Sequence, residues 1–272
     1  MLGYKRIFVT FLVATFADVL TIKSVSANQE SNDPKEANSA LVLVSDDEIL
    51  PGSHFEARRR EFSIGTFNVT IKQNWRVLGL GCVVWPASVL LSKLLSNDKF
   101  YSNVLHLNVQ NKLVVELGTG TGLPSIIAAL NGASKVVATD RNDIIEKCTK
   151  KNILATIDDV PNLSAETLDW DTDGAESLIK SHGTPDIIIG ADLIYHESAF
   201  KPLADTLFAL SGKDTQIIIT GKQRYKELNE KFQSLLIDFT FKKLDATDLG
   251  SLVEDTRDYV YVLKKSEKRC DM

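Results

Sequence analysis

Cysteine and histidine are scarce in this chain of 272 residues. Its three cysteines, Cys82, Cys148 and Cys270, are far apart and odd in number, so they predict neither a disulfide framework nor a zinc site. The four histidines are equally scattered, and we expect no structural metal. The net charge of −5 comes without a long basic run, so general nucleic-acid binding is not indicated.

The amino-terminal apolar run, Ile7 to Leu20, is interrupted by Asp18 and is too short to predict a transmembrane span. Lys5 and Arg6 precede it and the small residues 24–27 follow it, which is the layout of a secretory signal peptide. A buried helix, or an extension unrelated to the function of the domain, is the alternative.

The rest of the chain has the hydrophobic content and charge of an ordinary globular protein. Residues 28–57 are polar and rich in turn formers, which predicts a disordered linker. A regular pattern of strands and helices begins at residue 58. We therefore expect an amino-terminal extension (1–27), a linker (28–57), one domain (58–266) and a short tail (267–272).

The most informative stretch is LVVELGTGTGLP, from Leu113 to Pro124. Leu113–Leu117 predicts a buried strand, the glycines predict a turn, and a helix pattern follows, which is the context of a nucleotide-type binding turn. The third glycine comes one residue earlier than in a dinucleotide fingerprint. Glu116 would repel a pyrophosphate but could attract an ammonium group, and S-adenosylmethionine carries an ammonium group and no phosphate. A plain strand-to-helix turn is the alternative.

Two further strand ends carry acids. Asp140 ends the strand Lys135–Asp140, about 20 residues beyond the glycines, where a carboxylate can accept both hydroxyls of a ribose; a helix N-cap is the alternative. The weaker strand Ser164–Leu168 leads to Asp169 and Trp170, which could bracket an adenine. A half-buried loop tryptophan is the alternative for the second site.

Trp85 stands at the entrance of another predicted helix, Ala87–Leu95, and Pro86 suits the first turn of that helix. The approach, residues 79–85, is rich in glycine, which permits close contact with a ligand. The tryptophan could therefore form the wall of a ligand pocket, and a position in the core is the alternative.

Pro185–Gly190 is the strongest strand pattern in the chain and is predicted to be central. It leads directly to Asp192 and Tyr195. Since ligands of open α/β sheets bind beyond the carboxyl ends of the strands, we expect these two side chains where a substrate meets the cofactor. Two later strands, Phe239–Leu244 and Asp258–Leu263, are expected to form an antiparallel edge pair.

Gln216–Thr220 predicts one further strand, so the predicted strands number seven and alternate with helices. This pattern predicts an α/β fold with a Rossmann-like, seven-stranded, mostly parallel sheet, helices on both faces and an antiparallel edge strand. A small β-hairpin, Glu61–Ile64 with Phe67–Lys72, is expected to precede it.

Five motifs together resemble the seven-strand S-adenosylmethionine-dependent methyltransferases, and within them the protein-lysine methyltransferases of family 16. The motifs are GCVVWPASVLLSKLL (81–95), VVELGTGTGL (114–123), the acid of VVATD (Asp140), LDW (168–170) and GADLIY (190–195). The resemblance covers residues 58–265 and is closest to the branch that methylates valosin-containing protein, a hexameric ATPase chaperone. Pro86 departs from that branch, in which an aspartate would follow the tryptophan.

The resemblance implies S-adenosyl-L-methionine as the cofactor and a cytoplasmic or nuclear location, which conflicts with the signal-like amino terminus; the secretory pathway is the alternative. We expect a monomer that acts on a protein substrate and not on nucleic acid or a membrane. The reasoning from the glycine turn adds Glu116 to the cofactor contacts. The contacts that the resemblance implies are Trp85, Gly118, Thr119, Gly120, Asp140, Trp170 and Ala191.

In such an enzyme a neutral lysine amine would attack the sulfonium methyl in line. We expect Asp192 to orient the amine and Tyr195 to line the lysine channel, and we assign no general base. The alternatives are an arginine methyltransferase, a non-catalytic module that binds S-adenosylmethionine, and a nicotinamide oxidoreductase. The glycine spacing and Glu116 argue against the oxidoreductase.

Overall fold

The computed structural model of the protein describes residues 20–22, 42–44, 56–96, 105, 107–156, 160–253 and 255–266. Most of the expected extension and linker, and the whole tail, lie outside these residues. Between residues 1 and 57 the structure describes two strands, β1 (Leu20–Ile22) and β2 (Val42–Val44), which pair antiparallel. The signal peptide and the linker therefore stay predictions.

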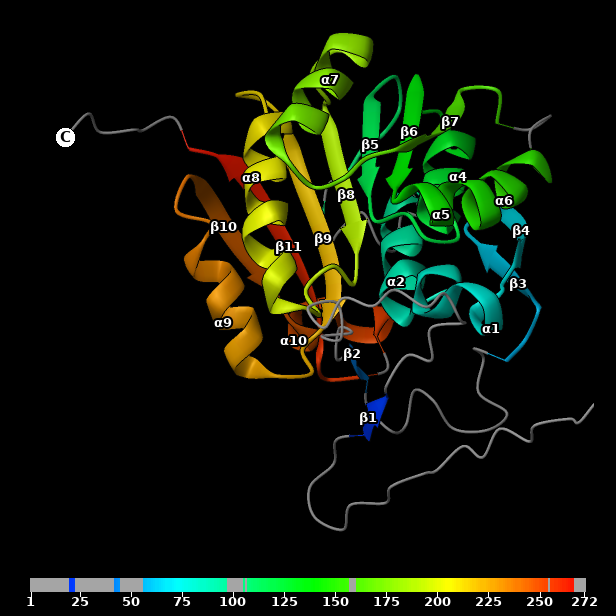
Figure 1. Cartoon of the computed structure of the whole chain (residues 1–272), viewed down its shortest axis with the longest axis horizontal. Helices are drawn as coiled ribbons and strands as arrows, with labels where there is room; N and C mark the ends of the chain where they lie inside the picture. Colours follow the sequence, from blue (N-terminus) through cyan, green and yellow to red (C-terminus); the bar gives the residue numbers. More distant parts are fainter. Residues whose placement is uncertain are drawn as a thin grey trace, which may run out of the picture.

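A sheet of seven strands forms the centre of the described domain (Figure 1). The strands are β5 (Leu113–Leu117), β6 (Lys135–Asp140), β7 (Leu163–Thr167), β8 (Ile187–Ala191), β9 (Gln216–Lys222), β10 (Phe239–Leu244) and β11 (Asp258–Lys265). Their order across the sheet is β10–β11–β9–β8–β5–β6–β7. The five strands from β9 to β7 are parallel, whereas β11 runs antiparallel to both β9 and β10. The predicted fold class, the central position of β8 and the antiparallel edge pair are confirmed.

Alternate residues of the parallel strands point to opposite faces of the sheet. Val114 and Ile189 pack on one face, and Val115 and Ile188 pack on the other, all without solvent exposure. A sheet that is buried on both faces needs apolar residues at nearly every position. This is why its strands are continuous apolar runs in the sequence rather than alternating ones.

Helices cover both faces of the sheet (Figure 1). One face carries α2 (Pro86–Leu95), α4 (Leu123–Leu130) and α6 (Lys150–Leu154), and the other carries α7 (Thr172–His182), α8 (Phe200–Leu210) and α9 (Lys226–Ser234). No single helix in the described part of the chain has the length and hydropathy of a membrane span, although the bent pair Trp75–Cys82 and Pro86–Leu95 passes that test jointly.

The predicted hairpin is present as β3 (Arg59–Ile64) and β4 (Phe67–Lys72). Its inner side chains, which include Phe62 and Val69, join the core on the α2 and α4 face. Short elements occupy the connections: α1 (Trp75–Leu78), η2 (Gly79–Cys82), α5 (Asn142–Ile144), the π-helical turn η3 (Ile145–Thr149), η4 (Glu197–Ala199), α10 (Ala246–Leu249) and η5 (Gly250–Leu252).

The chain changes direction across the sheet between β5 and β8. β6 and β7 follow on one side of β5, while β8 and β9 lie on the other side. The loops that follow β5 and β8 therefore run in opposite directions from the carboxyl ends of these two neighbouring strands. A crevice at such a switch point is where open α/β sheets bind their ligands.

Candidate functional site

The glycine turn after β5 lies at this switch point. Gly118, Gly120 and Gly122 have positive φ angles of 62°, 53° and 86°, which residues with side chains rarely adopt. A Cβ atom at Gly120 would also lie 3.0 Å from the carbonyl oxygen of Gly81. The turn therefore needs glycine both for its conformation and for the close approach of the segment that leads to Trp85.

Glu116 lies beneath this turn and is 1% exposed. Its carboxylate accepts hydrogen bonds from Thr119 Oγ1 at 2.7 Å, from Ser125 N at 3.1 Å and from Ser125 Oγ. Burial raises the pKa of Glu116 to about 7, although the hydrogen bonds from Ser125 and Thr119 favour the charged form. The side chain ties β5 to the start of α4, and its contact with the cofactor ammonium stays a prediction.

Asp140 connects the ends of β5 and β6. Its Oδ2 accepts from Gly120 N and its Oδ1 accepts from Arg141 N, both at 2.8 Å. Burial raises the pKa of Asp140, and these two hydrogen bonds oppose that rise. The N-cap of the next helix is Arg141 rather than Asp140. The carboxylate therefore lies against the glycine turn, and each oxygen keeps a lone pair for a ribose hydroxyl.

The loops after β7 and β8 meet at Gly118. A Cβ atom on this glycine would lie 2.7 Å from Leu193 Cδ2 and 3.5 Å from Trp170 Cζ2. Trp170 is half-buried and packs against the core on the α7 and α8 face. The ring that we expect to pack on adenine is thus brought next to the glycine turn.

Trp85 is the N-cap residue of α2, and this helix begins at the carboxyl ends of the parallel strands. Thr220, near the carboxyl end of β9, donates from its hydroxyl to Ala87 O at 2.8 Å and so holds the start of the helix there. The Trp85 indole donates to Leu80 O at 3.1 Å, and the Arg224 guanidinium lies 5.3 Å from the ring centroid. The ring is half-buried, as the wall of a pocket would be.

Ala191, Asp192 and Tyr195 come at and after the carboxyl end of β8. Asp192 has a positive φ of 57°, and its N–H donates to Thr220 O at 2.8 Å. Tyr195 is 40% exposed. Its partial burial raises its pKa, and the charges of Asp140 and Asp192 raise it further, against the opposing charge of Arg141.

Arg224, which follows β9, was missed by the sequence analysis. Its guanidinium binds Asp192 with two hydrogen bonds, Nη1 to Oδ1 at 2.8 Å and Nη2 to Oδ2 at 2.9 Å. Both side chains are buried. Its place just beyond the carboxyl end of a strand is the signal by which the sequence could have indicated it.

The prediction that the cysteines form no disulfide is wrong, because Cys82 and Cys148 are bonded to each other. They are 66 residues apart in the sequence, and spacing alone does not reveal a contact that the fold creates. Both are buried and pack with Ile144. The neighbouring Thr149 donates from Oγ1 to Gly120 O at 2.7 Å, so the disulfide borders the glycine turn.

This arrangement fits S-adenosylmethionine. The glycines of positive φ leave bare backbone against which a nucleoside can lie, and Asp140 offers acceptors to a ribose. Asp140 places a carboxylate beside the turn, which disfavours a ligand with phosphate groups. Within the described ranges, no group of three or more His, Cys, Asp or Glu side chains could hold a metal ion.

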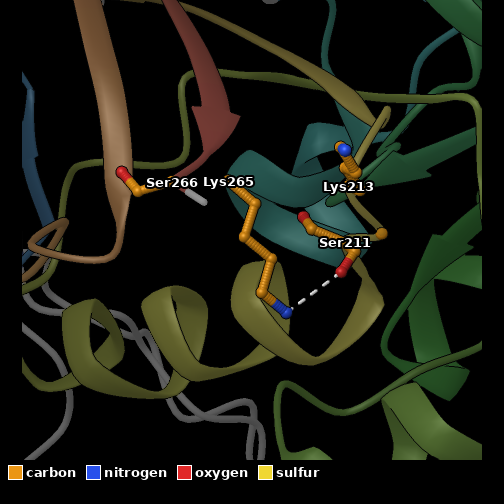
Figure 2. Close-up of a pocket in the computed structure, with 5 residues that line it drawn as sticks. Ser211, Lys213, Lys265 and Ser266 are labelled. Carbon is orange, nitrogen blue, oxygen red and sulfur yellow. Dashed lines mark hydrogen bonds between the residues drawn. The ribbon is translucent and has the colours of Figure 1, made fainter. Parts of the chain in front are cut away.

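A hollow of about 410 Å³ lies beside the start of β9 and the end of β11, at the amino ends of the parallel strands and away from the glycine turn; Figure 2 shows the residues that line it. It is lined by Ser211, Gly212, Lys213, Lys265 and Ser266. Lys265 Nζ donates to the carbonyl oxygens of Phe208 and Ser211, both at 3.1 Å, and lies 3.7 Å from the centroid of the Phe208 ring. This lysine stabilises the C-terminal end of α8, and the hollow takes no part in the site at the glycine turn.

Residues 65–238 match the model of a family described as lysine methyltransferase, family 16. The chain is 33% identical to the protein N-lysine methyltransferase METTL21A of Xenopus tropicalis, over 74% of this chain and 88% of that protein. It is 34% identical to METTL21A of Danio rerio, over 69% and 81%. It is 29% identical to the EEF1A lysine methyltransferase 3 of Mus musculus, over 80% and 87%.

The crystal structure of SMU.776, named as a methyltransferase complexed with SAH, superimposes with a TM-score of 0.54. The two sequences are 17% identical, and the match covers 76% of this chain and 56% of that one. At this identity the likeness shows the fold alone.

Proposed function

This chain belongs to the lysine methyltransferase family 16, and from that membership we propose that it is a protein N-lysine methyltransferase. Its cofactor is S-adenosylmethionine. The observation that carries the proposal is that Asp140 and the loop from Asp192 to Tyr195 both reach the glycine turn at the carboxyl ends of the parallel strands: Asp140 accepts from Gly120 N, and Leu193 of that loop packs against Gly118. The cofactor contacts and the acceptor residues are thereby adjacent.

The reaction in this proposal is an in-line displacement. A neutral lysine amine attacks the methyl carbon, the N–C bond forms as the S–C bond breaks, and S-adenosylhomocysteine leaves. Free lysine has a pKa of about 10.4, so the amine must first lose a proton, which passes to water. The positive sulfonium charge nearby lowers that pKa.

The side chains of the protein position the two reactants. Asp192, held at the carboxyl end of β8, orients the amine. The exposed ring of Tyr195 lines the channel by which the lysine side chain enters. Trp85, Trp170 and the glycine turn enclose the cofactor.

We propose a valosin-containing-type ATPase chaperone as the first protein substrate to test, because residues 81–95 carry the likeness to that branch. Elongation factor 1A is the second, because a relative of 29% identity is named for it. We propose a monomer in the cytoplasm or nucleus. The secretory pathway is the alternative, and the Cys82–Cys148 disulfide favours it because oxidising compartments preserve disulfides.

The test supplies the full-length protein with S-adenosylmethionine tritiated in its methyl group. A valosin-containing ATPase, elongation factor 1A and whole-cell lysate are offered as acceptors, and the labelled proteins are hydrolysed to amino acids. Methyl-lysine on either purified protein supports the activity and names the substrate, whereas methyl-lysine only in the lysate keeps the activity and removes both named substrates. Methyl-arginine, or cofactor binding without label on any acceptor, would contradict the proposal.

A further inference from the structure

Asp192 and Arg224 form a buried ion pair beside the proposed lysine channel. Both carboxylate oxygens accept from the guanidinium, at 2.8 and 2.9 Å, and the side chains are 8% and 9% exposed, respectively. A bidentate pair of this kind fixes the plane and direction of both groups. The carboxylate charge is therefore matched by a cation of the protein before any substrate arrives.

The groups that contact the ion pair or feel its charge come from four elements. Arg224 follows β9, Tyr195 belongs to the loop of Asp192, and Tyr259 belongs to β11. Burial raises the pKa of Tyr195 and of Tyr259, and the charge of Asp192 raises both further. At the entrance of α2, the ring of Trp85 lies 5.3 Å from the Arg224 guanidinium. Both phenols are therefore neutral near pH 7, and the charge of Asp192 is balanced by Arg224.

An unpaired carboxylate would work against the proposed reaction. The attacking amine must be neutral, but a negative charge within about 4–6 Å stabilises the ammonium form and raises its pKa by roughly 1 to 3 units. Asp140, whose charge also acts on Tyr195, already places one carboxylate at the cofactor side. A second one without a partner would hold more of the substrate in its unreactive form at neutral pH.

We propose that Arg224 is a positioning residue that cancels the charge of Asp192 in the acceptor site and holds its carboxylate near Trp85. The paired Asp192 still accepts a hydrogen bond from the N–H of a neutral amine, because each carboxylate oxygen has a second lone pair. The site thus binds its acceptor as an amine rather than as an ammonium ion. This inference rests on the proposed function.

The same pair separates lysine from arginine as the acceptor. An arginine acceptor needs carboxylates that engage its guanidinium in a bidentate manner. Both carboxylate oxygens of Asp192 already accept such a pair of hydrogen bonds from Arg224. An arginine substrate would have to displace a buried guanidinium of the same shape, whereas a lysine amine needs one lone pair.

The test compares the wild type with Arg224→Met, Arg224→Lys, Asp192→Asn and the double variant Asp192→Asn/Arg224→Met. Methionine removes the charge and keeps an unbranched side chain, lysine keeps the charge, and the double variant removes both charges. kcat and KM for the acceptor are measured across neutral and alkaline pH, on the lysine substrate that the tritium assay identifies. Arg257→Met is the matched control, because it removes a more exposed pair, with Asp255.

In the wild type, kcat should rise with pH as the substrate amine loses its proton. We expect Arg224→Met to shift the midpoint of this rise by about one pH unit to higher pH. At neutral pH kcat should fall by roughly tenfold, while KM for the acceptor does not rise. Arg224→Lys and the double variant should keep the wild-type position of the pH profile, even with a lower kcat. Arg257→Met should keep both the profile and the rate.

Two measurements on the same proteins do not depend on methyl transfer. The melting temperatures of the cofactor-free variants should reveal coupling: Asp192→Asn and Arg224→Met each lower the melting temperature, and the double variant lowers it by less than the sum. The affinity for S-adenosylhomocysteine, measured by calorimetry, should stay close to that of the wild type.

An unchanged pH profile in an active Arg224→Met protein, or additive melting shifts, would overturn the inference and leave the proposed function standing. Absence of methyl-lysine from the wild-type reaction would overturn the proposed function and this inference together. If Arg224→Met does not fold, the double variant tests the inference instead. A pH profile of kcat that is shifted from that of the wild type would then contradict the proposed role of the Arg224 charge.

Discussion

Glu116 makes the stability of this protein depend on pH. Burial raises its pKa from 4.5 to about 7. Between these two values the folded protein holds a proton that the unfolded chain has released, so the free energy of unfolding falls as the pH rises. The stabilising contribution is complete below about pH 4.5 and is lost above about pH 7.

Glu116→Gln should remove this dependence while it keeps an acceptor oxygen for Thr119 and Ser125. From pH 4.5 to about pH 7, the free energy of unfolding should fall by about 3 kcal/mol more in the wild type than in the variant. Urea unfolding of the cofactor-free proteins at several pH values measures the difference. The exposed Glu176→Gln serves as the control and should follow the wild type; parallel curves for the wild type and Glu116→Gln would refute the assignment.

Asp192 belongs to the acceptor half of the proposed mechanism. Asp192→Asn should reduce methyl transfer by about 100-fold, because the amide disturbs both Arg224 and the direction of the amine. Its affinity for S-adenosylhomocysteine should hardly change. Single-turnover kinetics measures the rate of methyl transfer, and calorimetric titration measures the affinity for S-adenosylhomocysteine. Asp205→Asn, at a carboxylate that pairs with Lys201 on the surface, is the control. A variant with the wild-type rate would remove Asp192 from the mechanism.

At the scale of an element, the turn between β5 and α4 depends on bare backbone. Gly120→Ala should weaken binding of S-adenosylhomocysteine by about tenfold or more, because the new Cβ would lie 3.0 Å from Gly81 O. The left-handed backbone at this position adds a loss of about 1–2 kcal/mol in stability. Calorimetry and urea unfolding measure the two effects.

Gly183→Ala is the matched control for this turn. Gly183 also has a positive φ, of 91°, but a Cβ atom there meets nothing within 4 Å. The control should also lose free energy of unfolding, because its backbone, with φ 91° and ψ 173°, is one that essentially only glycine adopts, and it should keep its affinity for S-adenosylhomocysteine. Equal affinities in the two variants would show that the turn does not hold the cofactor.

The elements that could be predicted from the sequence are those with local signals. Unbroken apolar runs marked the parallel strands, and closely spaced glycines marked the turn, because each signal acts within a few residues. α7 was missed because its sequence is mostly polar, with Ala175 and Leu178 as its buried residues. An N-cap bond from Gly174 N to Asp171 and packing on α8 hold this helix instead.

At the scale of the whole molecule, contacts between distant segments had no local signal. The approach of Asp140 and Trp170 to the glycine turn could be expected from the rule that ligands bind at strand ends. The pair of Asp192 and Arg224 joins residues 32 positions apart and depends on β8 lying beside β9. No periodicity or spacing in the sequence encodes that neighbourhood.

The Cys82–Cys148 disulfide acts on the whole molecule because it restricts the unfolded chain across 66 residues. A loop of that length corresponds to about 4 kcal/mol of stabilisation. Cys82→Ser/Cys148→Ser should therefore melt roughly 10 °C below the wild type, whereas Cys270→Ser, which keeps both bonded cysteines, should not. Scanning calorimetry measures the shift, and reductant added to the wild type should reproduce it. Equal melting temperatures would contradict the presence of the disulfide in solution.

The disulfide also closes part of the backbone into a covalent ring, from Cys82 to Cys148. Trp85, β5, the glycine turn and Asp140 lie within the ring, whereas Asp192 and Arg224 lie outside it. A single cut between Trp85 and β5 leaves one covalent molecule while the sulfur–sulfur bond is intact. After reduction, the same cut releases Trp85 with the amino-terminal fragment. Redox conditions thus determine whether a nicked chain keeps Trp85 in the same covalent molecule as the rest of its site.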